Sequence, residues 1–259
     1  MKFAKLFTIL FLSLSILFSA CKKDDDNESD PPVLLYYGWA AGTSDGSYGT
    51  IIHTKDGGNT WTRQGDSLQL PNAGFNDVCI LDTSNILVVG DSIPNSQGHN
   101  VYRSSDGGKT WSMSGAGLSN VEYDGIYAYD YNNIWIVGDQ GNIYYSDDGG
   151  FSWTKKDVPA EFQNIGFLRV CASAIDNIWV GGYFHPADSF PVLLHSTDMG
   201  GTWQRVHALE DLGMDQTKMG HFLSIKNKGN SIWAMGGPGK FIIRSDDNGS
   251  TWTNVSVKP

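Results

Sequence analysis

Apolar residues along this chain fall into short runs separated by polar turns. Four runs share one form, an Asn or Ser followed by a few apolar residues and glycine: NILVVGD (85–91), NIWIVGD (133–139), NIWVGGY (177–183) and SIWAMGG (231–237). Runs of this length, rich in β-branched residues, are typical of strands buried on both faces. Another apolar run precedes each of them and a third follows. Apolar spacing of three and four is missing from any long stretch, so the pattern predicts many strands and few helices.

A polar turn follows the third run and occurs five times: TKDGGNTW (54–61), SSDGGKTW (104–111), SDDGGFSW (146–153), STDMGGTW (196–203) and SDDNGSTW (245–252). We call these turns the boxes. Their aspartates and tryptophans are Asp56, Trp61, Asp106, Trp111, Asp148, Trp153, Asp198, Trp203, Asp247 and Trp252. The central glycines allow positive φ, the aspartate can accept hydrogen bonds from the turn, and the tryptophan can enter the core. We therefore predict structural boxes that join a third strand to a fourth.

The spacing of the boxes predicts the architecture. Successive box aspartates are 50, 42, 50 and 49 residues apart, a period typical of propellers and other repeat folds. Four short antiparallel strands per period make one propeller blade. The prediction is an all-β, five-bladed β-propeller over residues 33–259. VLLYYG (33–38) aligns with second strands, so the first blade should lack its innermost strand, leaving an edge that a loop, the tether or a partner strand could cover.

These features resemble a known family. The boxes resemble the Asp-box, or bacterial neuraminidase repeat, and the fuller unit is most similar to propellers related to the photosystem II stability and assembly factor. The resemblance covers about residues 33–259 and implies that the boxes are structural, at the periphery of the blades and away from any active site. It also implies a protein partner.

The N-terminus predicts export. MKFAK is basic and LFTILFLSLSILF is apolar, as in a secretory signal, and the apolar run is too short to span a bilayer. SAC resembles the end of a lipoprotein signal, so residues 1–20 should be removed and Cys21 should carry lipid; a cleaved signal with a chance cysteine is the alternative. CKKDDD resembles an export signal of Bacteroidetes-type lipoproteins, which implies an anchored protein at the outer-membrane surface, or facing the periplasm. Residues 21–32 would be an acidic tether.

Charge, cysteine and histidine content limit the binding partners, disulfides and cofactors that can be expected. The net charge of −10 argues against nucleic acid and against anionic lipid, so we expect membrane contact only through the N-terminal lipid. Cys79 and Cys171 lie in the same phase two repeats apart, too distant to pair, and should be buried free thiols. Histidine and acidic residues lack ligand spacing, so neither a metal site nor a cofactor is predicted. His53 and His195 occupy the same repeat position as Arg103 and Arg244, which should be a surface site on a strand.

Topology places the possible binding residues. Loops between strands two and three, and between blades, should emerge opposite the boxes, and several are long; we call this side the loop face. The loop-face residues expected to bind are Trp39, Tyr48, Tyr123, Arg169, Tyr183 and His185. Several of these aromatic residues could instead cap the core.

The sequence gives little sign of catalysis. The chain has five arginines and lacks the F/Y-R-I-P motif and the three-arginine clamp of neuraminidases. Asp77 and Asp124, near the starts of inner strands in neighbouring blades, are weak candidates for a carboxyl pair. The favoured interpretation is a non-catalytic envelope lipoprotein that binds a protein partner. The alternative is a carbohydrate-active protein, either glycan-binding or a glycoside hydrolase, that uses the loop face.

Overall fold

The structure is a computed structural model that describes residues 36–66, 70–91, 100–187, 189–215, 217, 220–237 and 240–256. The predicted signal peptide, Cys21 and the tether lie outside these ranges. No helix in the described part of the chain is long and apolar enough to cross a membrane.

The described chain is a series of five antiparallel sheets, each formed by consecutive strands. Blade 1 consists of β1 (Gly38–Gly42), β2 (Thr50–Thr54) and β3 (Thr62–Arg63); blade 2 of β4 (Phe75–Ile80), β5 (Ile86–Gly90), β6 (Val101–Ser104) and β7 (Ser112–Met113); blade 3 of β8 (Tyr123–Ala128), β9 (Ile134–Gly138), β10 (Ile143–Ser146) and β11 (Thr154–Lys156). Blade 4 consists of β12 (Phe167–Ala174), β13 (Asn177–Phe184), β14 (Pro191–Ser196) and β15 (Gln204–Arg205); blade 5 of β16 (His221–Lys228), β17 (Ser231–Gly237), β18 (Phe241–Ser245) and β19 (Thr253–Asn254). One short 3-10 helix (Ala160–Phe162) and α1 (Ala208–Asp211) lie between blades.

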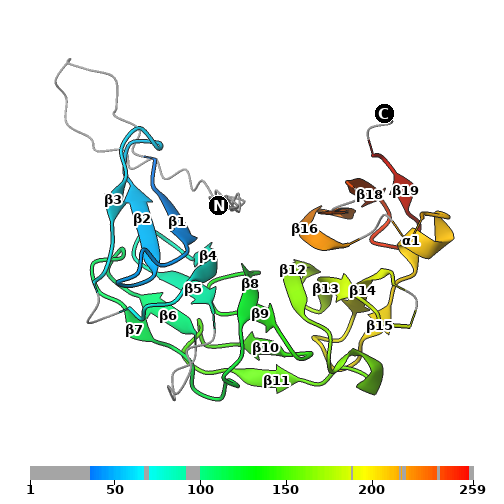
Figure 1. Cartoon of the computed structure of the whole chain (residues 1–259), viewed down its shortest axis with the longest axis horizontal. Coiled ribbons are helices and arrows are strands. Elements are labelled where there is room, and N and C mark those ends of the chain that lie inside the picture. Colours follow the sequence, from blue (N-terminus) through cyan, green and yellow to red (C-terminus); the bar gives the residue numbers. More distant parts are fainter. Residues whose placement is uncertain are drawn as a thin grey trace, which may run out of the picture.

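This is the predicted five-bladed β-propeller, with a first blade of three strands and four blades of four. Within the described residues blade 1 has no innermost strand, as predicted. The alignment behind that prediction was wrong, however, because VLLYYG (33–38) was matched to the second strands, whereas the second strand of blade 1 is β1 and Trp39 lies at the position of Leu87. Figure 1 shows the blades following one another around an arc, with β4, β8, β12 and β16 on its inner side. Blade 1 and blade 5 are at the two ends of the arc and lie apart.

The hydrophobic core lies between neighbouring blades. Each of four clusters of buried residues combines strands from two adjacent blades, as where Trp135 of blade 3 packs beside Val180 of blade 4. The second strands of blades 2 and 3 are completely buried, as the apolar runs predicted: Ile86 to Val89 and Ile134 to Val137 all have no exposed area. The second strand of blade 5 is partly exposed, with Met235 at 39%. Cys79 and Cys171 are buried free thiols, also as predicted.

The boxes are turns held by hydrogen bonds to their own aspartate. In the fourth box the backbone N–H and hydroxyl of Thr202 donate to Asp198 at 2.8 and 2.7 Å, and the Ser196 hydroxyl donates at 2.8 Å. Ser196 in turn accepts from the N–H of Gly200. The first, second, third and fifth boxes repeat this arrangement around Asp56, Asp106, Asp148 and Asp247. The turn between the first and second strands of a blade lies at the same end of the blade as the box, since the N–H of Gly107 donates to the carbonyl of Ser84 and that of Gly149 to the carbonyl of Asn132.

One sequence interpretation of the third strands needs correction. We expected His53, Arg103, His195 and Arg244 to occupy a surface position beside the boxes. Instead His53 and Arg103 are 5% and 4% exposed, and His195 stacks on Trp179 with ring centroids 3.8 Å apart. In blades 1, 2 and 4 this position faces the paired residue of the second strand, and the next blade covers both. Arg244 in blade 5 does lie at the surface, as expected, with a side chain that is 41% exposed.

Candidate functional site

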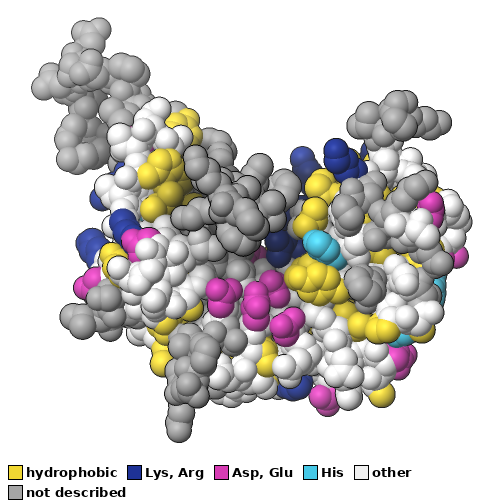
Figure 2. Space-filling view, viewed as in Figure 1, with side chains coloured by type: hydrophobic (Ala, Val, Ile, Leu, Met, Phe, Trp, Pro, Cys, Tyr) yellow, Lys and Arg dark blue, Asp and Glu magenta, His cyan; other side chains and the backbone are white. Residues whose placement is uncertain are grey.

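Four of the five blades contribute to a polar site on the inner side of the arc, at the blade ends opposite the boxes. In Figure 2 acidic side chains gather at the centre of this face, next to a histidine and hydrophobic side chains. The acidic residues are Asp91, Glu122, Asp124 and Asp139, which are near enough to influence one another's charge. We call these four the acidic cluster.

A repeated β-bulge positions the site. The pairing of each innermost strand with the second strand shifts register near its start, between Phe75 and Asp77, Tyr123 and Gly125, Phe167 and Arg169, and Phe222 and Ser224. Bulges bend a strand and turn a side chain out of the regular pattern, and they are frequent beside active sites. The residue inside the bulge is Asn76, Asp124, Leu168 or Leu223 in the four blades.

The glycine that ends each second strand allows this close packing. A methyl group built on Gly138 would lie 2.0 Å from the carbonyl oxygen of Glu122, and one on Gly90 would lie 2.1 Å from that of Gly74. Any side chain here would push the start of the inner strand away. The residue after the glycine, Asp91 or Asp139, therefore begins its loop directly beside the bulge, and Asp139 donates its N–H to the Glu122 carbonyl at 3.0 Å.

Arg169 links the bulges of three blades. Its guanidinium donates to the carbonyl oxygens of Leu223 at 2.8 Å and Asp124 at 3.0 Å, and to Leu168 beside it. All three acceptors are bulge residues. Arg169 was predicted to bind a ligand on the loop face, whereas the structure uses its hydrogen bonds to hold blades 3, 4 and 5 together beneath the acidic cluster.

Burial and like charges raise the pKa of Asp124 to about 7. Burial is the largest cause, and the neighbouring carboxyls of Glu122, Asp139 and Asp91 add to it, whereas Arg169 opposes it. The pKa of Glu122 is also raised, first by burial and then by Asp91. Two adjacent carboxyls that resist ionisation are typical of sites where a carboxylic acid delivers a proton at neutral pH.

The two carboxyls proposed from the sequence differ in role. Asp77 is half-buried; it follows the bulge and accepts hydrogen bonds from the N–H groups of Val78 at 2.9 Å and Ile126 at 3.1 Å. Asp124 is the bulge residue itself. Asp77 thus joins blades 2 and 3 through a backbone hydrogen bond, and its catalytic pairing with Asp124 stays a prediction from the sequence.

Tyr183 and His221 form one wall of the site. Their ring centroids are 5.1 Å apart, and Tyr183 is 41% exposed. A methyl group on Gly166 would meet both Asp139 Oδ1 at 2.7 Å and the Tyr183 ring at 2.8 Å, so ring and carboxylate flank the same point. Burial and then the charge of Asp124 raise the pKa of the Tyr183 hydroxyl. Tyr183 is therefore the predicted loop-face residue that the structure brings to the acidic cluster.

The other predicted binding residues are elsewhere. Trp39 is 1% exposed and stacks on His53, and Tyr123 has no exposed area and donates its hydroxyl to Ser119, so both belong to the core rather than to a binding surface. Their apolar rings fill gaps between blades. His185 lies in the loop after β13, where its Nδ1 accepts from the N–H of Ala187 at 3.3 Å, and packs its ring on Phe162.

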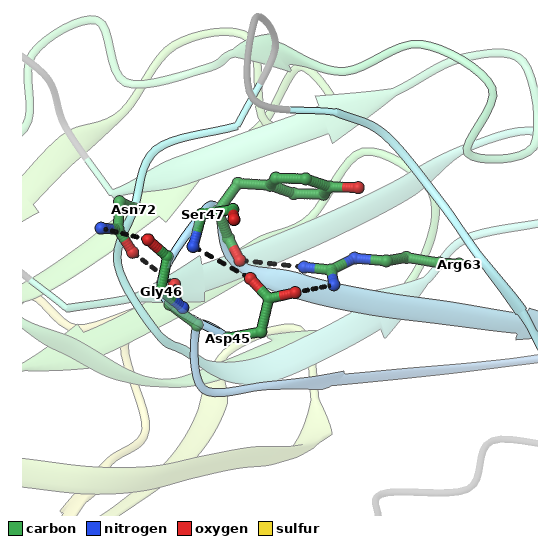
Figure 3. A network of polar contacts seen from close by, with 7 residues as sticks. Asp45, Gly46, Ser47, Arg63 and Asn72 are labelled. Atoms are coloured by element: carbon green, nitrogen blue, oxygen red, sulfur yellow. Dashed lines mark hydrogen bonds and ion pairs between the residues drawn. The ribbon is translucent and has the colours of Figure 1, made fainter.

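Tyr48 belongs to a self-contained network in the β1–β2 loop. Arg63 lies over the Tyr48 ring, 4.0 Å from its centroid, donates to the Tyr48 carbonyl and pairs with Asp45, while Asn72 donates to Gly46 (Figure 3). Ser47 donates its N–H to Asp45 at 3.0 Å. These contacts fix the loop of blade 1, and none of them involves the acidic cluster.

Sequence reasoning missed Asp91, Glu122 and Asp139. A signal was present, because the second strands of blades 2 and 3 both end in Gly-Asp. Blade 4 has Tyr183 at the corresponding position and blade 5 has Gly237. The residue that follows the glycine therefore differs between blades, although the strand before it keeps a similar pattern. Among the described residues, no three His, Cys, Asp or Glu side chains are arranged to hold a metal ion.

Known proteins match this chain in fold and partly in sequence. Residues 99–212 match the model of a family described as Sortilin, neurotensin receptor 3. The chain is 28% identical over 236 residues to a probable oligoxyloglucan-reducing end-specific xyloglucanase of Neosartorya fischeri, covering 80% of this chain and 27% of that protein. It is 26% identical over 187 residues to a xyloglucanase of Hypocrea jecorina, covering 70% and 19%. The chain thus spans about a quarter or less of the curated relatives it matches.

The solved structures support the same fold. The GH74 enzyme of Niastella koreensis matches with a TM-score of 0.59 and 19% identity, over 85% of this chain and 36% of that one. Its similarity confirms the β-propeller. The sequence-based interpretation of a non-catalytic assembly protein is contradicted, because the curated relatives are named as xyloglucanases. The sequence alternative of a carbohydrate-active protein is the one they favour.

Proposed function

We propose that the acidic cluster binds a polysaccharide of the xyloglucan class and hydrolyses a glycosidic bond in it. The observation that carries the proposal is Asp124, a carboxyl whose pKa is raised to about 7 among three other carboxyls, in a chain similar to named xyloglucanases. The proposal replaces the assembly role expected from sequence.

Glycoside hydrolysis needs two carboxyl groups with different tasks. One protonates the leaving oxygen, and the other acts as base or nucleophile at the anomeric carbon. Asp124 fits the acid, because burial keeps it protonated up to about pH 7. Asp139 fits the second role, because it is partly exposed and flanks the same point as Tyr183.

The remaining members of the cluster have protein partners. Asn76 donates to Glu122 at 3.1 Å, and the N–H of Gly74 donates to Asp91 at 2.9 Å. Within the described ranges, no such hydrogen bond is made to the carboxylate of Asp139. We therefore assign Glu122 and Asp91 to raising the pKa of Asp124 rather than to attack on the sugar.

Tyr183 and His221 would hold the sugar. An exposed aromatic ring beside polar groups suits the apolar face of a pyranose, and hydroxyl groups of the same sugar can donate to carboxylates. The burial of His221, followed by the charge of Arg169, lowers the pKa of its imidazole, so this wall stays neutral at neutral pH.

The test is hydrolysis of xyloglucan by the purified protein, followed by release of reducing ends. Asp124→Asn and Asp139→Asn should each lower kcat by about 10²–10⁴-fold. Asp211→Asn, at an exposed carboxylate on α1, is the matched control and should leave the rate unchanged. In the wild type, kcat/KM should fall as the pH rises through about 7, because Asp124 loses its proton.

Binding measurements separate the two parts of the proposal. Tyr183→Ala should weaken binding of xyloglucan oligosaccharides, measured by calorimetry, whether or not the chain cleaves them. Binding without turnover would leave a glycan-binding protein and reject hydrolysis. A chain that neither binds nor cleaves xyloglucan would overturn the whole proposal.

We further propose that the protein acts as a lipoprotein anchored at Cys21 on the outer-membrane surface. The support is sequence alone: the signal-like residues 1–20, the cysteine and the acidic tether at 21–32. Mass spectrometry of the mature N-terminus should find an acylated Cys21. An unmodified cysteine, or protection of the protein from protease added to whole cells, would contradict the anchor or its surface position respectively.

A further inference from the structure

The blades of this protein are joined by one repeated contact. In the second to fifth boxes, the glycine two residues after the aspartate touches the middle of the second strand in the preceding blade. A methyl group on Gly108, Gly150, Gly200 or Gly249 would lie 3.2, 2.5, 3.0 or 2.1 Å from Trp39, Leu87, Trp135 or Trp179 respectively. These four positions on second strands are 1%, 0%, 0% and 0% exposed. Each box thus covers a hydrophobic face of the blade before it.

The box tryptophan completes the joint. Trp111, Trp153 and Trp203 are only 5%, 6% and 5% exposed. Trp153 donates from its indole N–H to the carbonyl of Ser114 in blade 2 at 2.8 Å, and Trp203 packs edge-on against Trp135 of blade 3. Four occurrences in one chain define what a box requires of its neighbour: a second strand with a large apolar side chain at its centre.

Each end of the arc carries one of the two surfaces of such a joint: a box at blade 1 and a second-strand face at blade 5. In the first box, the only described atoms within 4 Å of a methyl group on Gly58 belong to its own Trp61, which is partly exposed. In blade 5, Trp233 occupies the position of Trp39, Leu87, Trp135 and Trp179, yet it remains partly exposed. Met235 and Val255 beside it are 39% and 45% exposed. We call Trp233, Met235, Arg244 and Val255 the blade 5 face.

Arg103 shows how a box contacts a blade face that carries an arginine. It lies in blade 2 at the position of Arg244, donates to the carbonyl of Gly149 in the third box at 2.6 Å, and lies under Phe151 of that box, 4.0 Å from the ring centroid. Arg244 lies 5.2 Å from the Trp233 ring centroid and pairs with Asp246. The residues of the first box that correspond to Gly149 and Phe151 are Gly57 and Asn59.

We propose that the blade 5 face binds the first box of a second copy of this chain, head to tail. Gly58 of one copy lies on Trp233 of the other, Trp61 packs beside Met235 and Val255, and Arg244 donates to the carbonyl of Gly57. Asp56 gives the incoming box a negative charge, since hydrogen bonds led by the Thr60 hydroxyl hold the pKa of its carboxyl at about 2. The joint is the one that the chain already makes four times within itself.

Such an interface is heterologous, because it joins two different surfaces. Heterologous contacts produce a ring if the rotation closes and a filament if it does not. The acidic cluster lies on the inner side of the arc, away from both ends of this joint, so association leaves it open. The proposal is therefore independent of the proposed hydrolysis, and either can fail without the other.

Chemical cross-linking tests which surfaces meet. Thr253 pairs directly with Arg244 across β18 and β19, so Asn59→Cys and Thr253→Cys place one thiol on each half of the joint. The background carries Cys21→Ser, and the native Cys79 and Cys171 are buried. With a short bismaleimide, the double variant should give a ladder of covalent oligomers on a denaturing gel. Mixed single variants should give only a heterodimer.

Three results would overturn the proposal. An internal cross-link without oligomers would mean that the arc closes on itself. Dimers from Asn59→Cys alone would mean that two boxes meet symmetrically. Absence of any cross-link, with the protein sedimenting as a monomer at every concentration reached, would mean that the face stays unoccupied.

A substitution on each half gives a second, independent measurement. Gly58→Val and Trp233→Glu should each weaken self-association by at least about ten-fold in sedimentation velocity, as expected for central residues of an interface. Met113→Glu, at a 52% exposed apolar residue of blade 2, is the matched control. Unchanged association in both variants, with melting temperatures close to that of the wild type, would contradict the proposed joint.

Discussion

The two ends of each blade use carboxyl groups in opposite ways. At the box end, Asp198 accepts hydrogen bonds from Thr202 and Ser196, and these lower its pKa to about 2. At the loop face, burial and neighbouring carboxyls raise the pKa of Asp124 to about 7. An aspartate at the box end is thus fixed as an anion, whereas an aspartate at the loop face has a pKa close to neutral pH.

The difference in pKa comes from burial at the loop face and from hydrogen-bond donors at the boxes. Each box surrounds its carboxylate with hydroxyl and N–H donors that favour the charged form. The bulge that presents Asp124 directs its carboxyl toward other acids, and the nearest cation, Arg169, uses its donors on backbone carbonyls. A carboxyl with donors stabilises a turn, whereas one without them is suited to proton transfer.

The largest expected effect is acid unfolding driven by the five boxes together. The pKa of each box aspartate is lowered, to about 2 in four of them. A carboxyl with a depressed pKa contributes stability that is complete above its unfolded value of 3.8 and is lost as the pH falls toward about 2. The free energy of unfolding, measured by urea denaturation, should drop steeply between these values. A flat profile there would contradict the role of the boxes.

Asp124→Asn should stabilise the fold at high pH. Burial raises the pKa of Asp124 from 3.8 to about 7, so the wild type loses stability as the pH rises through this range. The neutral amide avoids that loss, and the gain should reach about 2–4 kcal/mol above pH 8. It should vanish below pH 4. Equal stability of the two proteins at high pH would mean that Asp124 is not held in its acid form.

Asp148→Asn should have the opposite sign. Asp148 accepts hydrogen bonds from Phe151, Ser152 and Ser146, and an amide can replace only part of them. Urea denaturation at neutral pH should show a loss of about 2 kcal/mol. The activity of the folded fraction should be unchanged, because the box is at the far end of the blade. A loss of turnover without a loss of stability would place chemistry at the boxes.

Thr110→Val should have the smallest effect. The Thr110 hydroxyl donates to Asp106 at 2.6 Å on the exposed side of the second box, and water can replace it. We expect a loss of about 0.5–1 kcal/mol in the same denaturation experiment. Ser104→Ala is the comparison within that box, since the buried Ser104 also accepts from Gly108, and it should cost more.

The fold followed from sequence because its cause is local and repeated. The boxes recur in all five blades and the NIWIVG-type strands in four, so their period predicted the number of blades. The second strand of blade 1 was placed too early in the chain, at VLLYYG rather than at β1, because the GWAAG segment of β1 has no run of branched apolar residues to mark it. The sequence did not give the joint between blades. It placed Arg103 and His195 on a surface that the following box covers, because that contact joins residues about forty or more positions apart.

The candidate site was only partly predictable for a related reason. Asp124 and Tyr183 were selected from their places in the repeat, but the bulge that separates Asp77 from Asp124 has no marker in the sequence. A shift of one residue places Asp124 inside its bulge and Asp77 after its own bulge, where Asp77 accepts a hydrogen bond from the N–H of Ile126 in the next blade. Trp39 and Tyr123 were misplaced because an aromatic residue at the start or end of a strand can either fill the core or cover it.

The most direct test of the account is carbon-detected NMR titration of the aspartate carboxyls, with and without a xyloglucan oligosaccharide. We predict that Asp124 titrates near pH 7 and shifts on addition of the oligosaccharide, while Asp198 and Asp247 titrate near pH 2 and do not respond. An Asp124 that titrates near 3.8, or an oligosaccharide that perturbs the box aspartates instead, would contradict the division between a structural end and a functional end of the blades.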